Sequence, residues 1–184
     1  MPVYSFEGKK PVIASSAYVS PTATIIGDVI IGERCYIGHG SIIRGDYGSI
    51  KIGDETAVEE GVIIHARPDN RTVIEPRVTL GHGAMIHNAV IREGAVIGMR
   101  AVVSDDAEVG ASAIVGEMGL VKNGQQVPAH KVAVGFPVKV VCDVGERHRN
   151  MTHRAKEIYV DLASRYVAGG MVELQKKEWN HEDN

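Results

Sequence analysis

A branched aliphatic residue returns at nearly every sixth position along most of this 184-residue chain. The phase is held for more than a hundred residues, with three extra residues after Ile43, four extra after Ile64 and one step of five after Ile86. A period of six fits neither an α-helix of about 3.6 residues per turn nor simple alternation along one long strand. It predicts a coil of short strands joined by tight corners. The repeat positions are Val19, Ile25, Ile31, Ile37, Ile43, Ile52, Val58, Ile64, Ile74, Leu80, Ile86, Ile91, Ile97, Val103, Val109, Val115, Val121 and Val127.

Each hexapeptide is expected to form one side of a triangular prism, with its aliphatic residue pointing inward. Three hexapeptides then complete a turn of about 18 residues, and successive turns stack at the parallel-strand spacing of about 4.8 Å. Stacking supplies both the hydrogen bonds and the core. Glycine often follows the inward residue, as at Gly32 and Gly98, where a positive φ or a close backbone approach is needed. The predicted fold class is therefore mainly β, a parallel β-helix. A sandwich of many short strands is the disfavoured alternative, because it would not hold this phase.

The two ends of the chain differ from the repeat. Residues 1–18 are expected to cap the first turn as a short strand and loop. The coil is expected over about 11–141, inside a domain of residues 1–143, with 130–141 as a last turn and exit segment. In the remaining segment, 144–184, a helix is predicted from Glu146 to about Val167, ended by Gly169 and Gly170. The polar tail KKEWNHEDN is expected to be disordered. The helix rests on the spacing of Met151, Ala155, Ile158, Tyr159, Leu162 and Tyr166.

Composition excludes several classes of function. With 23 acidic and 20 basic residues the net charge is -3, whereas a strong nucleic-acid binder carries a basic surplus. No apolar run approaches the roughly 18 residues of a membrane span, and the first ten residues lack the apolar stretch of a secretory signal. Cys35 and Cys142 form neither a disulfide framework nor a thiolate zinc site. We therefore expect a cytoplasmic protein with no nucleic-acid or membrane partner and a small-molecule substrate.

Three polar residues directly follow inward positions and fall in phase. His65 and His87 are 22 residues apart, and removing the four inserted residues leaves 18, one turn. Arg44 precedes His65 by 21 residues, and removing the three extra ones again leaves 18. Arg44, His65 and His87 are therefore expected to form a column along one edge of the prism, with Asp46 at its base.

Two imidazoles one turn apart can share a metal ion, since zinc binds nitrogen at about 2.0–2.1 Å. A stable site needs a third protein ligand, and His82 is the candidate. His82 follows Leu80 by two residues, so it should point outward near a different corner and miss the pair of its own chain. It could reach the pair of a neighbouring subunit, and three prisms around a threefold axis would repeat this contact at every interface.

The segments RGDYGSIKIG (44–53), VEEGVIIH (58–65) and LGHGAMIHNAVIREGAVIGMRAVV (80–103) resemble the γ-class carbonic anhydrase family of hexapeptide-repeat proteins, and within it the homologues from carnitine and phenylacetate operons. The resemblance covers about residues 10–140. It implies a left-handed β-helix and a homotrimer with one Zn²⁺ per subunit interface, Fe²⁺ and Co²⁺ being alternatives. It also implies that His65 and His87 of one subunit and His82 of the next bind the metal, and that Arg44 and Asp46 form an intersubunit salt bridge.

The implied reaction is hydration of CO₂ to bicarbonate by a metal-bound hydroxide. Glu59 stands where the family carries the Gln that orients the metal-bound water, and Tyr159 resembles a tyrosine that reaches the metal pocket in close homologues. The chain departs from the family elsewhere: Ala57 lies near a family Asn, and Tyr47 and the Arg67-Pro68-Asp69 segment replace the proton-shuttle glutamates.

Three alternative functions remain open. A thioesterase could act on CoA esters through the same metal chemistry. A hexapeptide acyltransferase would use a histidine base in a groove between subunits, without the metal. A non-catalytic metal-bearing trimer would account for the missing shuttle acids.

Overall fold

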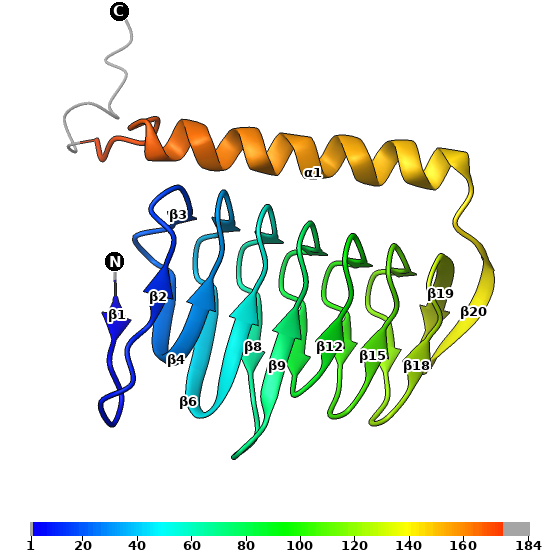
Figure 1. Cartoon of the computed structure of the whole chain (residues 1–184). Helices are drawn as coiled ribbons and strands as arrows, with labels where there is room; N and C mark the ends of the chain where they lie inside the picture. Colours follow the sequence, from blue (N-terminus) through cyan, green and yellow to red (C-terminus); the bar gives the residue numbers. More distant parts are fainter. Residues whose placement is uncertain (1, 175–184) are drawn as a thin grey trace, which may run out of the picture.

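The computed structural model describes residues 2–174 and shows a parallel β-helix followed by one α-helix. This architecture confirms the predicted fold class, mainly β with a C-terminal helix (Figure 1). The first sheet consists of β1 (Val3–Tyr4), β2 (Val12–Ile13), β4 (Thr24–Ile31), β6 (Ile42–Ile52), β8 (Ile63–His65), β9 (Arg71–Ile74), β11 (Met85–His87), β12 (Val90–Ile91), β14 (Val102–Val103), β15 (Glu108–Val109), β17 (Leu120–Val121) and β18 (Gln126–Val127). The second consists of β3 (Tyr18–Val19), β5 (Tyr36–Ile37), β7 (Ala57–Val58), β10 (Thr79–Leu80), β13 (Val96–Ile97), β16 (Ile114–Val115), β19 (Lys131–Gly135) and β20 (Val138–Asp143).

The two sheets make the three faces of the prism. The long strands β4 and β6 continue around a corner, so β6 pairs with β8 through its first part and with β9 through its last part. One face then runs through β8, β11, β14 and β17, and a second through β9, β12, β15 and β18. The second sheet is the third face. Its strands are parallel up to β19 and pair at matched repeat positions, for example Ile37 with Val58.

The repeat positions form the core. All of them except the half-buried Val19 are at most 2% exposed, and they belong to one continuous cluster of Ile, Val, Leu and Ala side chains. Each hexapeptide sends its repeat residue and a second, mostly small residue two positions earlier into the interior, for example Ile97 and Ala95, so the prism is narrow and has no room for aromatic rings. This geometry accounts for the scarcity of aromatic residues, 5% of the chain.

The glycines after inward residues are required by close packing between coils. A Cβ atom placed on Gly98 would lie 2.5 Å from the backbone nitrogen of Glu117 in the next coil, and Gly98 itself does not have a positive φ. Left-handed backbone occurs two residues later at the corner, for example at Arg100 with φ 56°. Of the two reasons that the sequence offered for these glycines, close approach is therefore the one that applies.

The ends of the coil are closed in different ways. At the N-terminus two short strands, β1 and β2, pair in parallel with β4, where the sequence predicted a single strand and a loop. At the other end β19 turns back into the antiparallel β20, a reversal that the repeat does not signal. The tail KKEWNHEDN lies outside the described residues.

Helix α1 (Glu146–Val167) has the predicted bounds and runs back along one edge of the coil from β20 towards β3 (Figure 1). Its packed face differs from the predicted stripe: Met151 and Ile158 are exposed by 61% and 52%, whereas Lys156 is buried. The aliphatic stem of lysine can pack like an apolar side chain, so Lys156 takes a place on the inner face. No helix within residues 2–174 is both long and apolar enough to cross a membrane.

Aromatic rings fix the C-terminal half of α1 to the first coils. Tyr18 of β3 stacks on Tyr166 of the helix with centroids 4.3 Å apart and on Tyr36 of β5 at 5.5 Å. Tyr159 lies 5.1 Å from the Tyr36 ring, and the buried Ala163 completes this cluster. The helix therefore sets the position of Tyr159 beside the third face of the prism.

The inward-facing ladder predicts a sharp difference between two neighbouring isoleucines. Ile31 is 2% exposed and Ile30 is 42% exposed. Ile31→Ala should lower the free energy of unfolding by roughly 2–5 kcal/mol, because it leaves a cavity that the coil cannot close. Ile30→Ala, the matched control, should cost less than about 1 kcal/mol. Urea unfolding at fixed protein concentration measures both values, and equal losses would contradict the assigned orientation.

Candidate metal centre

The structure brings Arg44, His65 and His87 together in one column. Arg44 of β6 pairs with His65 of β8, and His65 pairs with His87 of β11, each in parallel register. Both insertions in the repeat fall at members of this column, Arg44 and His65, so the coil widens there without losing the alignment. The ladder of inward aliphatic residues therefore determines where these polar side chains lie.

A chain of polar contacts runs along the column. Arg44 Nη1 donates to Asp46 Oδ2 at 2.5 Å, and Asp46 Oδ1 lies 3.1 Å from His65 Nε2. His65 Nδ1 faces His87 Nε2 at 3.1 Å. The other ring nitrogen of His87, Nδ1, contacts the Asp105 carboxylate. Each imidazole thus has one nitrogen on a carboxylate and the other directed at its neighbour.

This arrangement suits a metal ion. With Zn–N bonds of about 2.0–2.1 Å, two nitrogens of a tetrahedral zinc site lie about 3.3 Å apart, close to the observed separation of the facing nitrogens of His65 and His87. Metal-binding histidines usually present their second nitrogen to a carboxylate, which fixes the tautomer and the ring orientation. Asp46 is the carboxylate at the second nitrogen of His65, and Asp105 is the carboxylate at the second nitrogen of His87.

Burial and hydrogen bonds set the charge states in the column. Burial lowers the pKa of His65 and outweighs the hydrogen bond with Asp46 that would raise it, so the neutral imidazole is favoured. Burial alone would raise the pKa of Asp46, but hydrogen bonds from Arg44 and His65 hold it below its usual value. A neutral imidazole beside an ionised carboxylate is the state that binds a cation.

His82 lies in a second cluster on another edge. Its Nδ1 is 2.8 Å from Glu60 Oε2 and its Nε2 is 3.2 Å from Glu59 Oε2, with almost half of the side chain exposed. Tyr36 donates to Glu60 at 2.7 Å. Within residues 2–174 no three His, Cys, Asp or Glu side chains of one chain converge on a metal position. The structure thus brings His65 and His87 together and leaves His82 apart from them.

Glu59 and Tyr159 meet in this second cluster. Glu59 accepts a hydrogen bond from the backbone nitrogen of His82 at 3.0 Å and another from the Tyr159 side chain. Burial raises the pKa of Glu59 although His82 and Tyr159 act in the opposite direction. Burial also raises the pKa of Tyr159, and the Glu59 charge adds to it. The C-terminal helix therefore contributes a side chain to the surroundings of His82.

Sequence reasoning missed two carboxylates, Asp105 and Glu60. Asp105 follows His87 by 18 residues, one residue more than this turn, which pairs Ile86 with Val103, and this near-turn spacing is the signal that could have revealed it. Arg67 lies near Asp105, with Nη1 3.6 Å from Oδ2. Tyr47, which replaces a family glutamate, is 63% exposed with its ring 6.4 Å from that of His65.

Comparison with known proteins agrees with this coil. A model of the bacterial transferase hexapeptide, six repeats, matches residues 10–45. The carnitine operon protein CaiE of Proteus sp. (strain LE138) is 36% identical over 169 residues, which cover 92% of this chain and 86% of CaiE. The protein is thus a hexapeptide-repeat β-helix protein. It belongs to the family of the carnitine operon protein CaiE.

Two solved structures share the whole fold. A Bacillus cereus protein provisionally described as an acetyltransferase is 35% identical, with a TM-score of 0.89 and coverage of 90% of this chain and 96% of that one. A hexapeptide transferase family protein from Anaplasma phagocytophilum is 28% identical, with a TM-score of 0.86 and coverage of 90% and 98%. The names of these relatives indicate transferases, whereas the sequence motifs resemble a lyase family.

The role of Asp105 can be tested by metal affinity. Asp105→Asn should weaken zinc binding about 10- to 100-fold, because the amide no longer holds His87 in the tautomer that presents Nε2. Asp106→Asn is the matched control, since Asp106 contacts Asn88 and not the histidine pair. Competition with a chromophoric chelator measures both constants. If Asp105→Asn and Asp106→Asn bind zinc with equal affinity, Asp105 does not support the metal site.

Proposed function

We propose that the protein is a metal-dependent hydratase of the γ-class carbonic anhydrase type, which converts CO₂ to bicarbonate at the subunit interfaces of a homotrimer. The observation that carries the proposal is the His65–His87 pair, whose facing nitrogens lie 3.1 Å apart while each second nitrogen lies on a carboxylate. Such a pair provides two of the three ligands of a three-histidine site and is incomplete in a single chain.

His82 of the adjacent subunit is the proposed third ligand. Its Nδ1 lies 2.8 Å from Glu60 and its Nε2 lies 3.2 Å from Glu59, so Nε2, at the longer distance, is the nitrogen proposed for the metal. All three histidines then have a carboxylate on the nitrogen turned away from the metal, and His82 has a second carboxylate, Glu59, beside the proposed ligand nitrogen. A bound Zn²⁺ supplies a Lewis acid that ionises water near neutral pH, and imidazole ligands also suit Fe²⁺ and Co²⁺.

Glu59 is the proposed proton acceptor. Its Oε2 lies 3.2 Å from His82 Nε2, the nitrogen that would face the neighbour's histidine pair, so the carboxylate lies beside the reacting centre. Burial raises the pKa of Glu59 towards the range of an effective general base. Tyr159 donates to Glu59 and holds it in place. Arg44 and Asp46 serve as scaffold, because their charges pair with each other and with His65.

Acyl transfer is the second candidate, and the comparisons favour it. The Bacillus cereus and Anaplasma phagocytophilum relatives carry transferase names, and the hexapeptide model is that of a transferase. A thioesterase acting on CoA esters would use the same metal site as the hydratase. A non-catalytic metal-bearing trimer remains an alternative because Tyr47 and Arg67 stand where the resembling enzymes carry shuttle acids.

Metal content and CO₂ hydration together separate these functions. Protein purified without chelators should carry about one zinc, iron or cobalt ion per chain, and the metal-loaded protein should hydrate CO₂ in a stopped-flow indicator assay. His87→Ala, the control, should lose both metal and activity. Metal-free protein that transfers acyl groups from acyl-CoA would contradict the proposal in favour of a transferase. Metal-loaded protein that cleaves only acyl-CoA would indicate a thioesterase, and inactivity in every assay would indicate a scaffold.

A mixing experiment tests whether the ligands come from two subunits. His65→Ala and His82→Ala chains should each bind no metal. When they are unfolded together and refolded as mixed trimers, a fraction of the interfaces should regain an intact pair and an intact His82. Zinc content measures this recovery, with each variant refolded alone as the control. No recovery in a mixed trimer would show that all ligands belong to one chain.

A further inference from the structure

Lys156, in the middle of α1, is buried without a partner. It is 6% exposed, and no hydrogen bond or ion pair to its ammonium group occurs among residues 2–174. Lysine is almost never fully buried unless it is paired, because an unpaired ammonium group loses its hydration without compensation. The apolar packing of its stem explains why the side chain lies on this face of the helix, but not why that face carries a charge.

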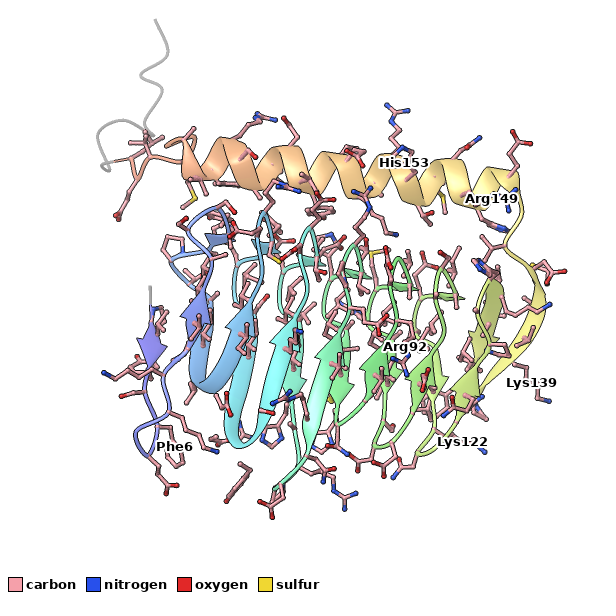
Figure 2. The ribbon with its side chains drawn as sticks, viewed as in Figure 1. Phe6, Arg92, Lys122, Lys139, Arg149 and His153 are labelled. Carbon is pink, nitrogen blue, oxygen red and sulfur yellow. The ribbon has the colours of Figure 1, made fainter. Side chains whose placement is uncertain are left out.

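A cavity lies where Lys156 faces the coil. It has a volume of about 410 Å³ and is bounded by the N-terminal half of α1 and by the corners of the later coils. Arg149 and Lys156 line it from the helix, and Arg77 and Ser112 line it from the coil. Figure 2 shows Arg149 and His153 on the part of the helix that lies over these coils. The cavity is separate from the His65–His87 column, none of whose side chains line it.

The charges around the cavity are mainly positive. Arg77, Arg149 and Lys156 line the cavity, and among the described lining residues the opposing carboxylate is that of Glu93. Glu93 is exposed and forms no ion pair with Lys156 within the described chain. Burial, with a further contribution from Arg77, lowers the pKa of Lys156 to about 8, so the ammonium form still predominates at neutral pH.

Arg77 does not supply the missing counter-charge. It is a cation itself, and its guanidinium group is already held by Glu55 of the coil and Glu157 of the helix. Arg149 uses Nη1 to donate to the Val144 carbonyl at 2.7 Å, which keeps its other donors near the cavity mouth. The result is a pair of cations, Arg149 and Lys156, beside a space whose one lining carboxylate among the described residues, Glu93, is exposed.

We propose that this cavity binds a small oxyanion, a phosphate or carboxylate group, with Lys156 Nζ as its central contact and Arg149 at its mouth. The anion would compensate the buried ammonium charge, and Ser112 offers a hydroxyl donor from the coil. A volume of about 410 Å³ is many times the roughly 30 Å³ share of one water, so it accommodates an anionic group attached to a small organic molecule. The site does not depend on the metal centre.

Isothermal titration calorimetry of the full-length protein at pH 7 and constant ionic strength tests the site with inorganic phosphate and, separately, acetate. One oxyanion should bind per chain, and the tighter of the two probes identifies the group. Lys156→Met should weaken binding at least tenfold. Lys139→Met is the control, because Lys139 is exposed on β20 at the same end of the coil (Figure 2) but does not line the cavity, and its substitution should leave the affinity unchanged.

Absence of saturable binding of either probe by the wild type would overturn the proposal. Binding of the tighter probe with the same affinity by Lys156→Met and by the wild type would also overturn it. If Lys156→Met fails to fold, Arg149→Gln provides the test at an exposed position. It should weaken binding several-fold, and an unchanged affinity there would exclude the site.

Discussion

The stacking of one coil on the next in matched register is the constraint on which the rest of the structure depends. The repeat residue of each hexapeptide and a smaller neighbour fill a narrow interior, and the backbone of each coil bonds to the next. A residue one turn further along the chain must therefore lie directly above its counterpart. This rule places His87 on His65 and His65 on Arg44. The insertion after Ile43 lies within the long strand β6, where the register against β4 shifts, and the insertion after Ile64 lies in the loop between β8 and β9. Both coils therefore return to phase.

The polar column follows from the same rule. In a compact domain with an irregular core, two histidines 22 residues apart have no fixed relation, but here both are tied to buried isoleucines. Their separation is then set by the spacing between coils. Carboxylates at the same edge, Asp46 and Asp105, direct the outer ring nitrogens and leave the inner ones facing each other. The stacked coils thus bring the proposed metal ligands together without a deep pocket, and the neighbouring subunit is proposed to complete the coordination.

The repeat itself made much of this predictable. The period of six predicted the prism, its inward residues and the column of Arg44, His65 and His87, because position along the chain maps onto position in space. The helix bounds followed from Gly169, Gly170 and the apolar spacing. The contacts of His82 with Glu59 and Glu60 depend on side-chain directions at a corner, which no period encodes. The prediction that Met151 and Ile158 lie on the inner face of α1 was wrong. Helical periodicity alone does not reveal that Lys156 packs its stem against the coil. Asp105 lies two residues beyond the repeat position Val103, whereas His87 lies one residue beyond Ile86, so the repeat does not place Asp105 in the column.

The central claim is that the facing imidazoles of His65 and His87 hold a metal ion with a third ligand from another subunit. Anomalous diffraction at the zinc edge from crystals grown with Zn²⁺ tests it most directly. The account predicts one strong peak per interface, about 2.0–2.1 Å from a nitrogen of each of these two histidines and from His82 of the adjacent subunit. A peak bound elsewhere, or no peak between the two rings in a zinc-saturated crystal, would contradict it.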